Sequence, residues 1–485
     1  MRLKYCFVSL SLALVSSLFA QAKIIHVPAQ YAKIQDAIIA AANGDSILVE
    51  PGTYRENINF RGKRVVLASR YLLTSDPAFI LSTIIDGSAP AHPDTASCVI
   101  INSGEDSTTM LMGFTLTGGV GTKWVDEHGA GTYVEGGGIL IQYSSPVIQS
   151  NLIINNSAIR RPSGTFSAGG GAIRVGDGMP RILNNMIVSN SGMYGGGIVL
   201  NYTGAIVRNN IIAYNRVYQA VAGAATFGGG GIWMTGTFED APKIIENNTV
   251  FGNASSGSGG GPAGRGGGVL VSSTTATLRN NIIWGNTQAR GTQIGLVGGA
   301  PTVTYSDVQD GYSGTGNISL DPMFADSSFH LLGNSPCIDA GDTSAIYNDV
   351  EDLGNPGMAK SPALGELRND MGAYGGPGGQ ELVRIVTAVE ERQNNRPPTV
   401  YALAQNFPNP FNPQTMIRFS LPASRLVSLK VYDLSGREIA TLINEIKPAG
   451  EHAVNFAARD LTSGVYLYTL RAGDFVATRK MLLVR

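Results

Sequence analysis

The chain has 485 residues, of which 62 are glycine, and only 15% of its residues are charged. About a quarter is typical of globular domains, so low charge with much glycine favours strands and turns over surface helices. A formal net charge of −1 provides no basic stripe or patch, which argues against nucleic acid as a partner. A hydrophobic fraction of 43% excludes a disordered chain.

Residues 1–22 have the pattern of a secretory signal peptide. Two basic residues precede an apolar run, and the small-residue pattern Ala20-Gln21-Ala22 follows. The run is shorter than the roughly 20 apolar residues that span a bilayer, and no other segment has the pattern of a membrane span. We predict cleavage after Ala22, export to the periplasm, and a protein that is not integral to the membrane.

The segment that follows predicts a short helix before the first strands. Ile34, Ala37, Ile38 and Ala41 fall on one face of this helix. Such a face can close the open end of a stack of strands, because a repeat array needs a cap over its exposed core.

An internal repeat occupies the centre of the chain. In each unit a glycine triplet is followed by an aliphatic-any-aliphatic step and then by two asparagines five residues apart. One unit cannot bury its own apolar face, so the units must stack with equivalent strands paired in parallel. We predict an all-β fold, a right-handed parallel β-helix. The triplets end at Gly138, Ala172, Gly197, Gly231 and Gly268.

The first asparagine of each pair is assigned a structural role. Asparagine tolerates the left-handed backbone conformation of a sharp turn, and its amide can bond to the coils above and below. At a spacing of about 4.8 Å such amides form a ladder. The predicted ladder consists of Asn151, Asn185, Asn210, Asn248 and Asn281.

Function is expected where the repeat is interrupted. Four insertions precede the glycine triplets, beginning with residues 120–135, and should project from one side of the stack. Alternation turns Arg174 and Trp233 outward on the adjoining strands, where aromatic side chains would form a stacking platform for a sugar chain. The alternative is that the insertions simply cover these residues. The predicted ligand-binding residues are Trp233, Arg174, Tyr143, Tyr202 and Trp124.

The catalytic candidates are few. The stretch Trp124-Val125-Asp126-Glu127-His128 is similar to the Trp-x-Asp-His motif of one pectate lyase group, although it has an extra glutamate. That likeness implies a polysaccharide lyase, with calcium and an arginine or lysine base. The alternative for this stretch is a solvated group of loop charges. The candidate catalytic residues are Arg174, Asp177, Asp126, Glu127 and His128.

Two further sets of residues leave alternatives open. Asp339, Asp342, Asp349 and Asp352 form an acidic cluster that either binds calcium or is solvated, and EF-hand spacing is missing. After signal cleavage two distant cysteines remain, Cys98 and Cys337, which either pair or stay free and buried.

The C-terminal region differs in character. The polar composition of residues 380–399 indicates a linker. The sequence of residues 400–485 predicts short strands that alternate with turns, as in a small β-sandwich. The order of NFPNPFNP, VYDLSGR, SGVY and a final KML closely resembles the type A C-terminal sorting domain of the type IX (Por) secretion system. This resemblance implies an immunoglobulin-like fold, contact with the type IX machinery, and secretion or attachment to the outer-membrane surface.

Residues 23–379 as a whole resemble secreted β-helix proteins of the pectin-lyase-like superfamily. The likeness is carried by YAKIQDAIIAAANGDSILVEPGTYRENINF, by the NNIIWGN repeat and by GNISLDPMFADSSFHLLGNSPCIDAGD, which is similar to the closing segment of extracellular bacterial β-helix proteins. It indicates the fold well and the activity poorly. The sequence therefore predicts an exported protein that binds extracellular polysaccharide or acts as an adhesin-like structural protein. The alternative is a lyase or glycoside hydrolase acting on an acidic, pectin-like polymer, and whether the protein is an enzyme stays open.

Overall fold

The computed structural model describes residues 22–126, 128, 131–160, 165, 167–218, 228–239, 241–256, 264–379, 401–403, 405, 406, 409, 411, 413–448, 450–458 and 461–484. They belong to two compact units, Met1–Ile385 and Val386–Arg485, each of which is described by itself. The predicted signal peptide, apart from Ala22, and the predicted linker lie outside the described residues. No helix among the described residues is long and apolar enough to cross a membrane.

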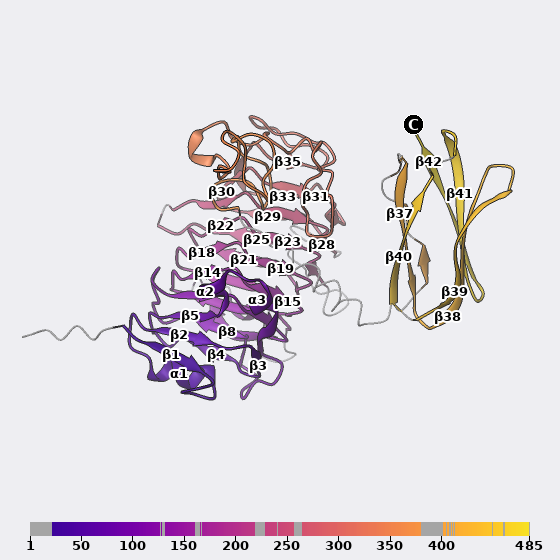
Figure 1. Ribbon diagram of the computed structural model, residues 1–485. Coiled ribbons are helices and arrows are strands. Elements are labelled where there is room, and N and C mark those ends of the chain that lie inside the picture. The colour runs from indigo at the N-terminus through magenta and orange to yellow at the C-terminus, as the bar shows by residue number, and fades with distance from the viewer. Residues whose placement is uncertain are drawn as a thin grey trace, which may run out of the picture. The chain divides into compact units, whose positions relative to one another are not determined.

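The first unit is a stack of coils whose strands form three long parallel sheets (Figure 1). The first sheet contains β1 (Ile24–Val27), β2 (Ser46–Val49), β5 (Val66–Ser69), β9 (Met110–Met112), β14 (Val147–Gln149), β18 (Arg181–Leu183), β22 (Ile206–Arg208), β26 (Lys243–Glu246), β30 (Thr275–Arg279) and β34 (Ala300–Thr304). The second sheet contains β3 (Gly52–Tyr54), β6 (Thr83–Asp86), β10 (Thr115–Thr117), β15 (Leu152–Ile154), β19 (Met186–Val188), β23 (Ile211–Ala213), β27 (Thr249–Phe251), β31 (Ile282–Trp284) and β35 (Asp307–Val308). The third sheet contains β4 (Ile58–Asn59), β8 (Val99–Ile101), β13 (Ile139–Gln142), β17 (Ile173–Gly176), β21 (Ile198–Asn201), β25 (Ile232–Thr235), β29 (Val269–Ser272) and β33 (Ile294–Val297).

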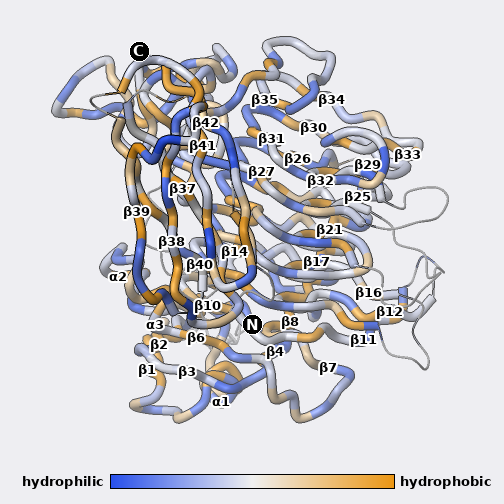
Figure 2. The backbone as a smooth tube through the Cα atoms, turned by 90° about the vertical axis from the view of Figure 1, so that its right-hand side faces the viewer, coloured by the Kyte–Doolittle hydropathy of each residue, from blue (hydrophilic) through white to orange (hydrophobic). Residues whose placement is uncertain are grey.

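Among the described residues, this unit also contains two smaller sheets and a few short helices. One small sheet contains β7 (Thr95–Ala96), β11 (Gly121–Asp126), β12 (Gly131–Glu135) and β16 (Ala168–Gly169), which lie together at one side of the stack (Figure 2). The other contains β20 (Ser191–Gly192), β24 (Arg216–Val217), β28 (Ala254–Ser255) and β32 (Thr287–Gln288). The short helices besides the N-terminal one are α2 (Tyr71–Thr74), α3 (Ala78–Ser82) and the 3₁₀ helix η1 (Ala345–Tyr347).

Repeat register aligns the aliphatic residues of successive coils inside the stack. Ile139 pairs with Ile173, and Ile173 pairs with Ile198 one coil further on. Because side chains alternate along a strand, one set of aliphatics points inward at every level and forms a continuous core. The prediction of an all-β, right-handed parallel β-helix is confirmed.

The N-terminal helix α1 (Ile34–Ala40) closes one end of this core. Ile34, Ala37 and Ile38 are fully buried and belong to the main hydrophobic cluster. The Glu56 carboxylate accepts hydrogen bonds from the first backbone amides of the helix, at 2.9 Å from Ile34 N. The predicted capping helix is therefore present.

Asparagine side chains form a ladder at the corner between the first and second sheets. The Nδ2 of Asn151 donates to Oδ1 of Asn185 at 3.1 Å, and Asn185 donates in the same way to Asn210 at 3.0 Å. Asn210 continues to Asn248, and Asn248 to Asn281. A second ladder begins at Asn156, five residues after Asn151. It repeats the pattern along the C-terminal ends of the strands of the second sheet, whereas the first ladder runs along their N-terminal ends.

The left-handed torsion, however, belongs to the residue before each ladder asparagine, which corrects the expectation that one asparagine serves both purposes. Asn184 and Asn209 have φ values of 52° and 54°. A left-handed residue turns its own side chain outward, so the amide that bonds inward along the stack comes from the next residue. The outward amides have another partner: Asn184 Nδ2 donates to Gly378 O, and Asn209 Nδ2 to Gly375 O, both at 2.7 Å. The closing segment therefore returns along the outside of the stack.

The second unit consists of two antiparallel sheets around their own core. One sheet contains β36 (Ala402–Leu403), β37 (Gln414–Leu421) and β40 (Gly450–Ala457). The other contains β39 (Glu438–Lys447), β38 (Arg425–Tyr432), β41 (Gly464–Ala472) and β42 (Phe475–Leu483). Buried aliphatic and aromatic residues fill the space between the sheets, as in the small β-sandwich that the sequence predicts.

Candidate ligand-binding site

The first insertion folds as a hairpin. Strands β11 and β12 pair antiparallel, with Trp124 opposite Tyr133 and Thr122 opposite Glu135. Alternation places Trp124, Asp126, Tyr133 and Glu135 on one face of the hairpin. The other face of β11 carries Lys123, which is exposed.

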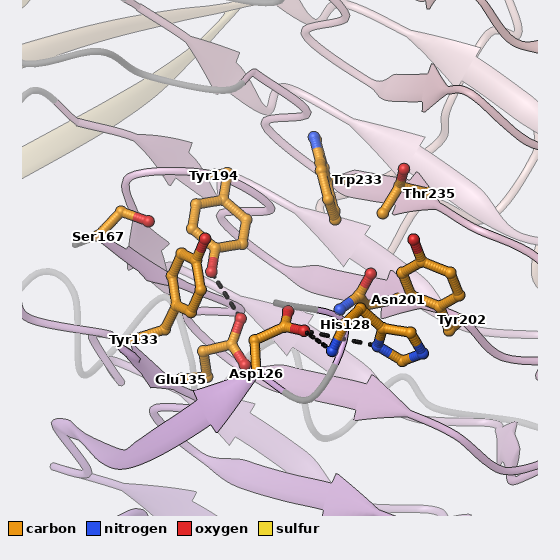
Figure 3. A pocket seen from close by; sticks show the side chains of 10 residues that line it. All are labelled: Asp126, His128, Tyr133, Glu135, Ser167, Tyr194, Asn201, Tyr202, Trp233 and Thr235. Atoms are coloured by element: carbon orange, nitrogen blue, oxygen red, sulfur yellow. Dashed lines mark hydrogen bonds and ion pairs between the residues drawn. The ribbon is translucent and has the colours of Figure 1, made fainter. Parts of the chain in front are cut away.

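A pocket of about 200 Å³ lies between this hairpin and the outer face of the third sheet (Figure 3). Trp233 of β25 and Tyr194 form an edge-to-face pair with ring centroids 5.3 Å apart. Figure 3 shows the carboxylates of Asp126 and Glu135 on the opposite side of the pocket from Trp233. The lining consists of Asp126, His128, Tyr133, Glu135, Ser167, Tyr194, Asn201, Tyr202, Trp233 and Thr235.

A buried ion pair holds one side of the pocket. Arg174 Nε lies 2.8 Å from Glu135 Oε2, and the side chains are 1% and 5% exposed. The Tyr194 hydroxyl donates to the other oxygen of Glu135 at 2.5 Å. Burial, and then the negative charge of Glu135, raise the pKa of Tyr194 well above its usual value, so this phenol stays protonated and remains a donor. Arg174 also donates to Gln142 of β13.

His128 lies near the tip of the hairpin, between two carboxylates. Its Nδ1 lies 3.5 Å from Asp126 Oδ1, and its Nε2 lies 3.5 Å from Asp177 Oδ1. The ring stacks on Tyr202 with centroids 3.6 Å apart and planes 3° apart. Asp177 has a φ of 47° and accepts a 2.7 Å hydrogen bond from Gln142 Nε2. These contacts attach the hairpin tip to the strand ends beneath it.

The structure brings several of the predicted residues together and separates others. Trp233, Tyr202, Asp126 and His128 line the pocket, and Asp177 lies directly behind His128. Tyr143 and Trp124 are not in the lining and pack against each other, with centroids 6.1 Å apart. Glu127, among the candidate catalytic residues, lies outside the described residues.

The expectation that Arg174 belongs to an open platform is wrong. Its side chain does point out of the core, but the hairpin covers it and Glu135 neutralises its charge. The aliphatics of the same outward column, Leu140, Val199 and Leu270, are also fully buried, whereas Trp233 is half-buried. Most of this column is therefore buried, and one aromatic ring remains at the pocket.

The sequence pattern did not predict a binding role for Asn201 and Thr235, two polar residues of the pocket lining. Asn201 and Thr235 are paired in register and occupy the fourth position of their strands. The equivalent positions in neighbouring coils are also small or polar: Gln142, Gly176 and Ser272. Alignment of the repeats shows a small or polar residue at this strand position in successive units, and this pattern is the sequence signal that could have indicated Asn201 and Thr235.

The acidic cluster near the end of the stack does not form one site. Asp342 lies 3.4 Å from Arg279, and Asp352 accepts the backbone N–H of Gly354. Asp349 is only 4% exposed and accepts backbone N–H groups of the returning segment, so the alternative of solvated acids is wrong for this residue. Within the described ranges, no three His, Cys, Asp or Glu side chains converge in the manner of metal ligands.

Asp339, another calcium candidate, accepts the backbone N–H of Glu366. Calcium binding by these aspartates stays a prediction. The two cysteines, Cys98 and Cys337, are buried and free, so the disulfide alternative is wrong.

A parallel β-helix with an aromatic pocket under an inserted hairpin, followed by a small antiparallel sandwich, defines a repeat-built solenoid protein with a separate C-terminal unit. Residues 128–319 match the family described as the right-handed β-helix region, and residues 405–484 match the secretion system C-terminal sorting domain. The protein thus combines a β-helix with a sorting domain for export through the type IX system to the cell surface or extracellular space.

Two solved structures are found as similar to parts of this chain. A pectin methylesterase variant in complex with a hexasaccharide is 11% identical with a TM-score of 0.31, covering 62% of this chain and 93% of the esterase chain. A PL6 family alginate lyase is 12% identical with a TM-score of 0.21, covering 64% of this chain and 55% of the lyase chain. No curated protein matches the chain.

Proposed function

We propose that the β-helix binds an extracellular polysaccharide or cell-surface glycan at the pocket beside Trp233. The observation that carries this proposal is the lining itself, in which four aromatic rings stand beside carboxylates and neutral polar groups. Sugar rings stack on aromatic faces, and their hydroxyls bond to carboxylate and amide groups. Export by the sorting domain would bring this pocket to glycans outside the cell.

The size of the pocket supports a particular mode of binding. A volume of about 200 Å³ is below the roughly 300–1,000 Å³ of pockets that enclose a drug-sized ligand. A space of this size suits one sugar unit, so we expect a polymer to lie over the pocket with a single unit inserted. Such contacts suit adhesion or display, because many copies of the protein held on one surface would bind the same polymer with avidity.

A glycan array followed by titration of the full chain tests this function. Trp233→Ala should lower the affinity for any bound glycan at least tenfold, because it removes the largest ring of the lining. Tyr143→Asn is the matched control: Tyr143 is an exposed aromatic outside the pocket with a φ of 51°, which asparagine tolerates. Absence of binding to every glycan, or equal losses in both variants, would contradict the proposal.

Glycoside hydrolysis is a second candidate, favoured by one observation. Asp126 and Glu135 line the same pocket, and most glycoside hydrolases use two carboxyl groups. Glu135 is held at both oxygens by Tyr194 and Arg174, which leaves Asp126 as the group able to exchange a proton with a substrate. If hydrolysis occurs, bound glycans will be shortened by the wild-type protein, whereas Asp126→Asn will bind them without forming product.

A further inference from the structure

The charges around the pocket are predominantly negative. Among its described lining residues the ionisable groups other than tyrosines are Asp126, His128 and Glu135, and none is lysine or arginine. The Asp126 side chain is 10% exposed, and its Oδ1 accepts the backbone N–H of His128 at 2.7 Å. A third carboxylate, Asp177, lies 3.5 Å beyond the His128 ring.

The nearest described cations do not offset these charges in the pocket. Arg174 is fully buried and engaged by Glu135, so this pair contributes no net charge. Lys123 is exposed on the opposite face of the hairpin, and Arg160 Nε donates to the carbonyl of Thr165 at 3.2 Å. Among the described residues, the carboxylates of Asp126 and Asp177 are therefore balanced only by His128.

The aromatic rings of the lining add attraction for the same sign of charge. An aromatic face is electrostatically negative and attracts a cation within about 6 Å of its centre. Tyr194 and Trp233 stand at 61° to each other, so their rings form two walls of the pocket rather than one flat surface. Rings at steep angles with a carboxylate beside them make a setting suited to ammonium groups, and Figure 3 shows Asp126 opposite Trp233.

We propose that the pocket selects a sugar unit with a free, protonated amine, as found in polymers of deacetylated amino sugars. This inference rests on the proposed glycan-binding function and specifies the ligand class of that site. The ammonium group lies beside Asp126 and faces the Trp233 ring across the pocket, while the sugar hydroxyls face Asn201 and Thr235. A uronic acid unit is disfavoured, because its carboxylate would meet Asp126.

The test compares two oligomers that differ only in the amine. Glucosamine oligomers and the N-acetylated oligomers of the same length are titrated into the full chain by calorimetry, at a pH at which the free amine is protonated. The free-amine oligomer should bind at least tenfold more tightly, and added salt should reduce this difference. Oligomers of uronic acids should bind most weakly.

Variants locate the effect at the pocket. Asp126→Asn keeps the size of the side chain and should make the two oligomers bind with similar affinity, whereas Trp233→Ala should weaken both. Lys123→Gln, at an exposed residue on the opposite face of β11 from Asp126, is the control and should leave both affinities unchanged.

The outcomes separate this inference from the proposed function. Equal binding of the amine and acetylated oligomers, still lost in Trp233→Ala, would overturn the amine preference and leave glycan binding intact. Amine preference that survives Asp126→Asn would also overturn it, because the charge would then be recognised elsewhere. No binding of any of these oligomers would overturn the amine preference, whereas glycan binding itself is overturned only if the glycan array also shows no bound glycan.

Discussion

Replacement of Asn210 tests whether the ladder stabilises the β-helix. Its Nδ2 donates to Ile182 O at 2.9 Å and to Asn248 Oδ1 at 3.0 Å, and its Oδ1 accepts the backbone N–H of Asn185 at 2.9 Å. Asn210→Ala leaves the buried Asn185 N–H without this acceptor, at about 1–3 kcal/mol, and removes three further side-chain bonds, two donated by its own Nδ2 and one accepted from Asn185 Nδ2, at about 0.5–1.5 kcal/mol each. The expected loss of stability is therefore about 2.5–7.5 kcal/mol.

Urea unfolding followed by tryptophan fluorescence measures this loss. All three tryptophans, Trp124, Trp233 and Trp284, belong to the first unit, so the signal reports on the β-helix and not on the C-terminal sandwich. Asn210→Ser should lose only about half as much, because a serine hydroxyl accepts the equivalent N–H at the end of the ladder, where Ser306 Oγ lies 3.1 Å from Asn281 N.

The control is Asn155→Gly, an exposed asparagine with a φ of 56° outside both ladders. Glycine adopts this conformation freely, so the variant should stay within about 0.5 kcal/mol of the wild type. If Asn210→Ala changes stability no more than this control does, the ladder contributes nothing and the reasoning is refuted.

Three further predictions concern buried ionisable groups. Burial, and then the Asp370 carboxylate, raise the pKa of Asp349 to about 8. The contribution of protonated Asp349 to the free energy of unfolding is therefore full below about pH 4 and falls by about 1.4 kcal/mol per pH unit up to pH 8. Asp349→Asn should flatten that slope in urea midpoints measured across this pH range. Burial lowers the pKa of Lys243 to about 8, so the free energy of unfolding should rise between pH 8 and about pH 10. Lys243→Met should abolish that rise without destabilising the fold at pH 7. A free energy of unfolding more than about 1 kcal/mol below that of the wild type at pH 7 would disprove this. Glu135→Gln should lower the free energy of unfolding by about 3–5 kcal/mol, because Arg174 would remain buried without its carboxylate partner. Adding Arg174→Met should recover most of this loss. An undiminished loss in the double variant would refute the ion-pair explanation.

Much of the fold could be predicted from the repeat, because the same pattern of aliphatic, glycine and asparagine residues recurs in every unit. The aliphatic positions of β13, β17 and β21 pair in register as predicted, and the capping face of α1 is buried. The turn chemistry was resolved only in part. Sequence reasoning placed the left-handed torsion on the ladder asparagine, whereas Asn184 takes the torsion and Asn185 forms the ladder.

The candidate site was less predictable because it combines one insertion with several coils. Trp233 and Tyr202 were expected near a ligand, and Asp126 and His128 were only catalytic candidates, yet all four line one pocket. Nothing in the chain order indicates that His128 would stack on Tyr202, 74 residues later, since that contact depends on how the hairpin folds back.

The sequence by itself determined the architecture: a short motif repeated with constant spacing has one way to bury its aliphatics, namely stacking in parallel. Tertiary structure decided which outward residues remain accessible. Arg174 and Trp233 occupy the same outward column, but the hairpin neutralises and buries the arginine through Glu135 and leaves the tryptophan at the pocket. Periodicity specifies the direction of a side chain, whereas its accessibility and charge balance depend on non-repeating segments that are distant in sequence and meet only in the folded chain.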